Sequence, residues 1–151
     1  MTERELIKKF ESKNITLASF GKRFIAYTID DFIVAALICI AFSDFVFAAN
    51  SFKESLWIFV EYLSPYIVAV KIIYHTFFVC LYGATIGKMV VKIRVICIYN
   101  GETPDFYMSL IRATVRVISE AFLFVGFIWA FVNNKRQTWQ DIIAKTLVVD
   151  A

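Results

Sequence analysis

Charged and titratable side chains occur inside stretches of sequence that are otherwise apolar, and these residues have the clearest capacity for chemistry. Asp30 and Asp31 lie in one apolar run, and Lys71 and His75 lie in the next. A charged group at the centre of a bilayer costs about 2.5–3.5 kcal/mol, so it normally faces other protein groups and often marks an ion pathway or proton relay. The sequence therefore raises the question of ion or proton chemistry inside a membrane.

The spacing of these residues limits which of them can meet. Arg23 and Asp30 are seven residues apart and share a helix face about 10 Å apart along the axis, whereas Asp31 points about 100° away from Asp30. Lys71 and His75 are four residues apart and share a face of the second helix. In an antiparallel pair of helices, His75 falls near the depth of Asp30, so either aspartate can reach Lys71 or His75.

Two interpretations of these charges compete. In the first, they form buried ion pairs that hold the helices in register. In the second, they form an ion or proton path, where a desolvated carboxylate beside His75 titrates near neutral pH. Arg23 lies near a helix end, from which its long side chain can extend to the lipid phosphates.

The elements that hold these residues are predicted from composition. The chain is 60% hydrophobic with a mean hydropathy of +0.67, whereas soluble domains are about 45–50% apolar. A lipid bilayer is therefore the expected solvent and partner. The formal charge of +3 is too small and too scattered for a nucleic-acid interface.

Two apolar runs, 24–49 and 56–82, each exceed the roughly 20 residues that cross a bilayer. The short link between them predicts an antiparallel hairpin. The first run is too long and too charged for a cleaved signal sequence. We predict one membrane domain over 1–151, with these segments: an N-terminal arm 1–22, membrane helices 24–49 and 56–82, a loop 83–108, a third membrane segment 109–132 and a tail 133–151.

The third apolar run, 110–132, contains Arg112 and Arg116. Either the whole run crosses the membrane with its arginines at the interface, or it breaks near Ser119 and Glu120 and re-enters. The excess of Lys and Arg in the N-terminal arm and in the loop 83–108 places both in the cytoplasm. Because the tail is also basic, a re-entrant third segment is favoured. Within the tail, residues 133–141 are expected to form a solvated cytoplasmic loop, with Thr138 as a candidate helix N-cap.

Two short β-like pieces complete the predicted fold. Residues 90–96 are rich in β-branched side chains and precede the turn signal Asn100-Gly101, and 146–149 has similar composition. We expect them to pair on the cytoplasmic side. The predicted class is an all-α membrane protein, a transmembrane hairpin plus a third membrane or re-entrant segment, with a short cytoplasmic β-like element.

Other chemistry finds little support in the sequence. Cys39, Cys80 and Cys97 are isolated, and His75 is the single histidine, so neither a zinc site nor a redox pair is expected. The segment 83–88 (GATIGK) is too short for a phosphate-binding loop, and its glycines are expected to turn the chain out of the second helix. We expect no enzyme activity, no cofactor and no metal.

Several separated motifs resemble the RDD family of bacterial membrane proteins. They are Arg23-Phe-Ile-Ala-Tyr-Thr-Ile-Asp30, the segment 83–88 with Ile93-Arg-Val95, the Arg112 and Arg116 helix, and Lys135-Arg-Gln-Thr-Trp-Gln-Asp141 followed by 144–149. The resemblance covers about 17–149. Its arginine and two aspartates correspond to Arg23, Asp30 and Asp141. The chain departs from the family in having Gln140 before Asp141, where the family often has His, and Lys145 where it has Gly.

The resemblance implies a multi-pass protein of the bacterial cytoplasmic (inner) membrane, for which transport of ions or small ligands is expected. Our first hypothesis is cation/proton exchange, in which Asp30 carries the exchangeable charge, Arg23 tunes it and Asp141 gates it. So few crossings require a homo-oligomer to enclose a path for a monovalent cation or proton. The alternative is a non-catalytic scaffold or accessory subunit whose intramembrane charges are structural.

Overall fold

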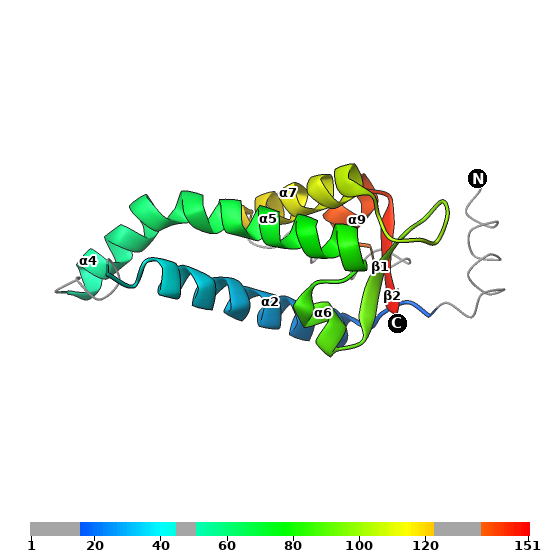
Figure 1. Cartoon of the computed structure of the whole chain (residues 1–151), viewed down its shortest axis with the longest axis horizontal. Coiled ribbons are helices and arrows are strands. Elements are labelled where there is room, and N and C mark those ends of the chain that lie inside the picture. Colours follow the sequence, from blue (N-terminus) through cyan, green and yellow to red (C-terminus); the bar gives the residue numbers. More distant parts are fainter. Residues whose placement is uncertain (1–15, 45–50, 123–136) are drawn as a thin grey trace.

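The computed structural model describes residues 16–44, 51–122 and 137–151, which form an elongated helical body with a small sheet at one end (Figure 1). Residues 1–15 of the predicted N-terminal arm 1–22 lie outside the described residues. The first long helix, α2, spans Phe20–Ala41 and begins after Ser19, whose hydroxyl accepts from the backbone N–H of Lys22 at 3.3 Å. It therefore starts four residues before the predicted membrane run, because this cap lets a polar first turn form ahead of the apolar one.

The second long helix is continuous through three segments: α4 (Phe52–Trp57), the π-helical η1 (Ile58–Leu63) and α5 (Ser64–Tyr82). It begins after Ser51, which caps Glu54 N–H, so it starts inside the turn that the sequence predicted over 50–55. Pro65 follows the π-helical segment. Proline has no backbone N–H to donate to the carbonyl four residues earlier, and the wider π-helical turn accommodates the missing hydrogen bond.

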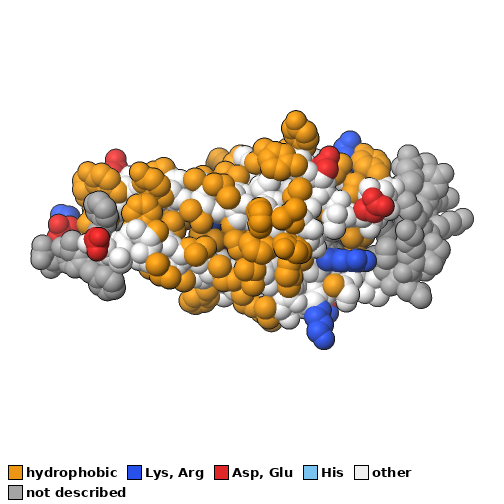
Figure 2. Space-filling view, viewed as in Figure 1, with side chains coloured by type: hydrophobic (Ala, Val, Ile, Leu, Met, Phe, Trp, Pro, Cys, Tyr) orange, Lys and Arg blue, Asp and Glu red, His pale blue; other side chains and the backbone are white. Residues whose placement is uncertain are grey.

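Both long helices expose apolar side chains along their length. They are long and apolar enough to cross a membrane, and only 22% and 6% of their most apolar windows is buried within the described part of the chain. Phe32, Ile40 and Ile73 are each more than two-thirds exposed. Figure 2 shows hydrophobic side chains covering the length of the body, with charges gathered toward its ends. A helix of a soluble core would be mostly buried, so these faces fit lipid.

The sheet pairs two segments that are far apart in sequence. Strand β1 (Ile93–Cys97) runs antiparallel to β2 (Thr146–Asp150), with Val95 opposite Val148. The predicted pairing of β-like pieces is therefore confirmed. A β-bridge from Leu17 to Val149 places the segment before α2 along the side of β2 that does not pair with β1. Part of the predicted N-terminal arm therefore belongs to the folded body.

The predicted strand 90–96 is wrong at its start. The chain leaves α5 through Gly83, whose φ of 68° is left-handed, and then forms the short helix α6 (Ile86–Val90) before the strand. Gly83 thus turns the chain as expected. Val90 is helical because Thr85 begins a new turn in extended conformation, and Lys92 then redirects the chain with a φ of 54°.

The third long helix, α7 (Phe106–Ala121), begins after Asp105, which accepts from Met108 N–H at 2.9 Å. It packs against α5 (Figure 1). Its buried positions are mostly polar: Ser109, Arg112, Ala113, Arg116 and Ser119. This polar stripe faces inward while residues such as Ile118 are exposed, which is the reverse of a soluble amphipathic helix.

The arginines of the predicted third segment 109–132 point into the protein. Arg112 and Arg116 are 7% exposed and contact residues of other helices, so their side chains face protein groups. The helix ends at Ala121, next to the predicted break at Ser119 and Glu120. The proposed re-entry falls on 123–136, outside the described residues.

The tail forms a short helix, α9 (Trp139–Ile143), ahead of β2. Thr138 caps it as predicted, through a reciprocal pair of hydrogen bonds with Asp141. The expectation of a solvated loop is wrong for the described part, because Gln137, Thr138 and Asp141 are buried. The amide of Gln137 donates to the carbonyl of Thr146 at 3.1 Å, which ties this segment to the sheet.

Candidate functional site

Asp141 lies at the centre of a buried cluster that joins α2, α7 and α9. Arg23 donates to Asp141 Oδ2 at 3.2 Å, and Arg112 contacts Oδ1. Thr138 donates to Oδ2 from its backbone N–H at 3.0 Å and from its hydroxyl at 2.8 Å. Arg112 also contacts the hydroxyl of Thr146 at 2.7 Å. One carboxylate, 1% exposed, therefore fixes three helices and the start of β2.

Asp30, on α2, occupies a second buried cluster. Its side chain is fully buried and accepts from the Tyr74 hydroxyl and the Gly87 N–H, each at 2.9 Å, and from the Thr85 hydroxyl at 2.6 Å. These three donors come from α5, α6 and the turn between them. The GATIGK segment therefore does bind an anion, but that anion is the protein's own carboxylate.

Two cations stand slightly farther from Asp30. Lys88 Nζ is 3.9 Å and an Arg116 nitrogen 4.0 Å from Asp30 Oδ2, beyond the 2.7–3.2 Å of good hydrogen bonds. Arg116 also lies 4.2 Å from the centre of the Tyr27 ring, a cation–π distance. Both cations thus balance the charge of Asp30 without a direct hydrogen bond to it.

A further set of ion pairs continues along the helices. Lys71 lies 3.0 Å from Asp31 and 2.6 Å from Glu120, and Glu120 accepts from Arg116 at 3.2 Å. Arg116 therefore links this set to the Asp30 cluster. Salt bridges connect α2, α5 and α7 over several turns.

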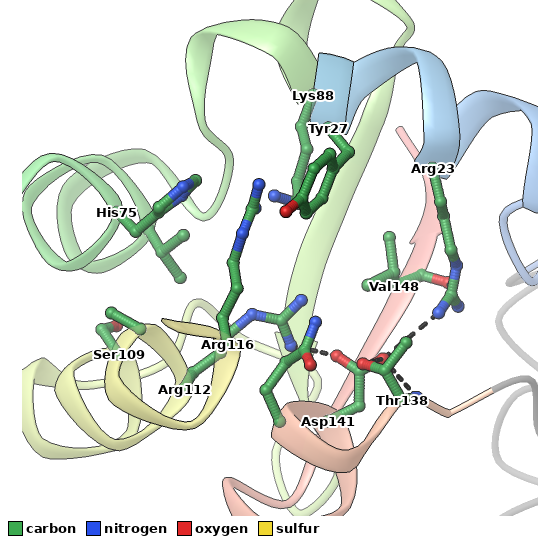
Figure 3. Close-up of a pocket in the computed structure, with 13 residues that line it drawn as sticks. Arg23, Tyr27, His75, Lys88, Ser109, Arg112, Arg116, Thr138, Asp141 and Val148 are labelled. Carbon is green, nitrogen blue, oxygen red and sulfur yellow. Dashed lines mark hydrogen bonds and ion pairs between the residues drawn. The ribbon is translucent and has the colours of Figure 1, made fainter. Parts of the chain in front are cut away.

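A small cavity lies among these clusters, at the end of the hairpin next to the sheet (Figure 3). Its volume is about 40 Å³, room for about three water-sized groups. Four basic side chains line it: Arg23, Lys88, Arg112 and Arg116. Among the described residues, Asp141 is the one carboxylate that lines the cavity. His75, Ser109 and Tyr27 also line it.

Burial sets the protonation of two groups at this cavity that lie outside the long helices. It lowers the pKa of the Lys88 ammonium to about 7; Asp30 opposes this shift, and Arg116 and Arg112 add to it. Burial alone would raise the pKa of Asp141. The charges of Arg112 and Arg23 and the hydrogen bonds from Thr138 outweigh it and lower that pKa below its usual value. Asp141 is therefore ionised, and Lys88 is poised between two charge states.

The predicted site residues are only partly brought together. Arg23 and Asp141 form an ion pair, so Arg23 turns into the protein rather than toward lipid phosphates. Asp31 pairs with Lys71 as one predicted combination required. Asp30 pairs with neither Lys71 nor His75 in the described structure, because the donors of α6 occupy its oxygens. His75 instead lines the cavity.

Sequence reasoning missed Thr85, Gly87, Lys88 and Glu120 as members of these clusters, and it did not predict that Arg112 and Arg116 contact Asp141 and Asp30. One signal was present. Ser109, Arg112, Arg116 and Ser119 recur at helical spacing within an apolar run, a pattern typical of an inward polar face. No group of three or more potential metal ligands occurs among the described residues.

These features define a helical membrane protein in which two apolar hairpin helices meet a buried charged cavity. The profile of the RDD family matches residues 17–145, and the chain belongs to the RDD family. The match confirms the resemblance. Of the arginine and two aspartates, Arg23 and Asp141 line the cavity, and Asp30 lies beside the lining residues Lys88 and Arg116.

Named relatives are similar over part of the chain. A proline-rich antigen homolog of Mycobacterium tuberculosis is 37% identical over 67 residues, 44% of this chain and 28% of that protein. The proline-rich antigen of Mycobacterium leprae is 34% identical over 65 residues, 43% of this chain and 26% of that protein. The similarity thus spans about a quarter of these relatives. No solved structure matches the chain.

Proposed function

We propose that this RDD protein is a transport-related membrane protein that handles an ion or small ligand at the buried cavity, as a homo-oligomer in the bacterial cytoplasmic membrane with its N-terminus in the cytoplasm. One observation carries the proposal. A connected set of ionisable groups runs from the half-buried Asp31 and Lys71, on the apolar helices, through Glu120 to the buried Arg116 and the cavity. Ionisable groups kept inside membrane helices commonly mark ion pathways.

The proposal assigns Asp30 a positioning role. An exchangeable carboxylate needs coordination sites for a cation, and the oxygens of Asp30 already accept three hydrogen bonds. The transported species is then expected to meet the basic wall of the cavity. Cation/proton exchange at Asp30, with Arg23 tuning it and Asp141 gating it, has less support from this geometry.

An accessory or scaffold role is the second candidate. The contacts of Asp30 and Asp141 favour this role, because each of these two carboxylates joins three or more elements. In a scaffold, the charges would serve to hold α2, α6, α7 and α9 in one arrangement. Buried ion pairs used in this way give helix register rather than net stability.

Flux measurements on the purified protein in proteoliposomes test the proposal. Transport predicts that a salt gradient drives movement of an ion across the vesicle wall, measured for a panel of cations and anions. Lys88→Met removes a cavity charge and should reduce flux at unchanged insertion. Arg94→Gln on the exposed side of β1 is the matched control and should leave flux unchanged. Well-inserted protein that moves no ion of the panel would instead support the scaffold.

The oligomeric state supplies an independent test. Two or three membrane crossings are too few to enclose a path, so transport requires copies to assemble. Mass measurement in mild detergent and in lipid discs should give an oligomer. A strictly monomeric protein in both would contradict transport.

A further inference from the structure

We infer that the cavity beside α7 is a binding site for a small inorganic anion, with Arg116, Lys88 and Ser109 as its main donors. This inference rests on the proposed function insofar as it names the class of ion that the site would handle. It stands by itself as a statement about binding.

The charge at the cavity favours an anion. Of the four basic side chains that line it, Arg23 and Arg112 share Asp141. Lys88 and Arg116 lie 3.9 and 4.0 Å from Asp30, too far for good hydrogen bonds to it. N–H groups of both side chains therefore remain available to donate to a ligand in the cavity. Over the connected ion pairs between residues that the structure describes, bases exceed acids by one: Arg23, Lys71, Lys88, Arg112 and Arg116 against Asp30, Asp31, Glu120 and Asp141. A buried positive charge without a counter-ion is costly, and a bound anion would compensate it.

Unpartnered polar atoms give a second, independent observation. Arg116 Nη2, Ser109 Oγ and His75 Nε2 are buried and have no hydrogen-bond partner among the described residues. All three side chains line the cavity, and their residues are 7%, 1% and 4% exposed. Buried polar groups almost always have partners. A ligand with several acceptor positions would satisfy Arg116 and Ser109 together.

The arrangement of the side chains brings the cations toward one point. In Figure 3 the ends of Arg116 and Lys88 approach each other beside the Tyr27 ring, and His75 faces Arg116 from the other side. The carboxylate of Asp30 lies 3.9 and 4.0 Å from these two cations and carries one negative charge. An anion bound in the cavity would reduce the repulsion that remains between the two cations.

The size of the cavity restricts the ligand. About 40 Å³ accommodates a halide or a single small oxyanion, but not a nucleotide. The same phosphate chemistry occurs in free orthophosphate and in a phospholipid headgroup. The proposal is for the free anion, because residues from six elements, α2, α5, α6, α7, α9 and β2, line the cavity.

Anion binding is tested by titrating the full-length protein in uncharged detergent with sodium chloride, sodium phosphate or sodium gluconate at constant ionic strength. Thermal stability reports occupancy, and line broadening of chloride-35 NMR reports chloride directly. We expect chloride or phosphate to raise Tm with saturation and gluconate, which is too large, to have no effect. Equal effects of all three salts would overturn the site and indicate general salt stabilisation.

Two variants keep the test independent of folding defects. Ser109→Ala removes a donor without changing charge and should weaken binding of the anion about tenfold, as expected for a hydrogen bond to a charged ligand. Lys88→Met should weaken it further, whereas Arg94→Gln should bind like the wild type. Wild-type affinity in both Ser109→Ala and Lys88→Met would overturn the proposal.

The lipid source is separated from the free anion by adding vesicles that contain phosphatidylglycerol or only phosphatidylcholine. Stabilisation by phosphatidylglycerol vesicles alone, with no response to chloride or phosphate, would contradict the site. Saturable anion binding without ion flux would reject the proposed transport while leaving the site in place. Ion flux without any anion dependence would do the reverse.

Discussion

Gly87 donates its backbone N–H to the carboxylate of Asp30 at 2.9 Å, and this contact brings α6 directly against α2. A Cβ atom at position 87 would meet the backbone carbonyl oxygen of Ala26 and lie 2.8 Å from Asp30 Oδ1. The absence of a side chain is thus a condition for the hydrogen bond. The fixed carboxylate in turn sets the positions of Tyr74 and Thr85 beside the cavity.

Gly87→Ala should therefore destabilise the protein strongly, because the added methyl group must separate two backbones and break a buried hydrogen bond. The overpacking alone costs about 1–3 kcal/mol. Gly21→Ala is the matched control, since a Cβ there meets no atom within 4 Å, and alanine is the better helix former by about 1 kcal/mol. Thermal denaturation in detergent should show opposite shifts in Tm. A Tm for Gly87→Ala at or above the wild-type value would show that α6 does not press on α2 in this way.

Asp141→Asn should lower the free energy of unfolding by about 3–5 kcal/mol, because it leaves Arg23 and Arg112 buried without their shared carboxylate. The surface pair of Lys22 and Asp150, at 2.5 Å with side chains 44% and 33% exposed, provides the comparison. Asp150→Asn should cost no more than about 1 kcal/mol. Chemical denaturation of both variants checks the contrast, and similar losses would mean that burial of Asp141 is not what makes its pair important.

Thr146→Val tests the link between α7 and the sheet. It keeps the shape of a fully buried side chain but removes the hydroxyl that Arg112 contacts at 2.7 Å. Loss of a hydrogen bond to a charged group costs about 1.5–3 kcal/mol. Thr114→Val should have a small effect, because the Thr114 hydroxyl donates to the Leu110 carbonyl within its own helix. Denaturation midpoints that fall equally for the two valine variants would contradict this assignment.

Anion binding should weaken as the pH rises from 6 to 8. Burial lowers the pKa of Lys88 to about 7, so its positive charge is present below that value and is lost above it. The groups that face it are Asp30 on α2, Arg112 and Arg116 on α7, and Asp141 on α9, with His75 of α5 in the same cavity.

The pH series is measured as the midpoint of the chloride titration at fixed sodium concentration. Lys88→Met should give weak binding with little pH dependence across this window. If the variant keeps the full pH dependence of the wild type, the titrating group is not Lys88.

The order and kind of the elements follow from the sequence to a useful extent. The two apolar runs, the β-like pieces around Val95 and Val148, and the cap at Thr138 all occur in the structure. Each depends on neighbours within a few residues, such as a capping hydroxyl or a run of β-branched side chains. The starts of the two long helices differ from the predicted ones, because the hydroxyls of Ser19 and Ser51 cap the helices before the apolar runs begin.

Sequence alone determined that charges must be buried inside this protein, because apolar runs long enough for a membrane carry Asp, Lys and Arg residues that lipid cannot solvate. Only the tertiary structure decided which charges meet. Asp30 accepts a hydrogen bond from the backbone N–H of Gly87. Nearly every residue has such an N–H, so the residue types in the sequence do not indicate which one Asp30 will bind. Helical spacing fixes the face on which Arg112 and Arg116 lie, but the rotation and depth of the neighbouring helices select Asp141 for Arg112 and Asp30 for Arg116.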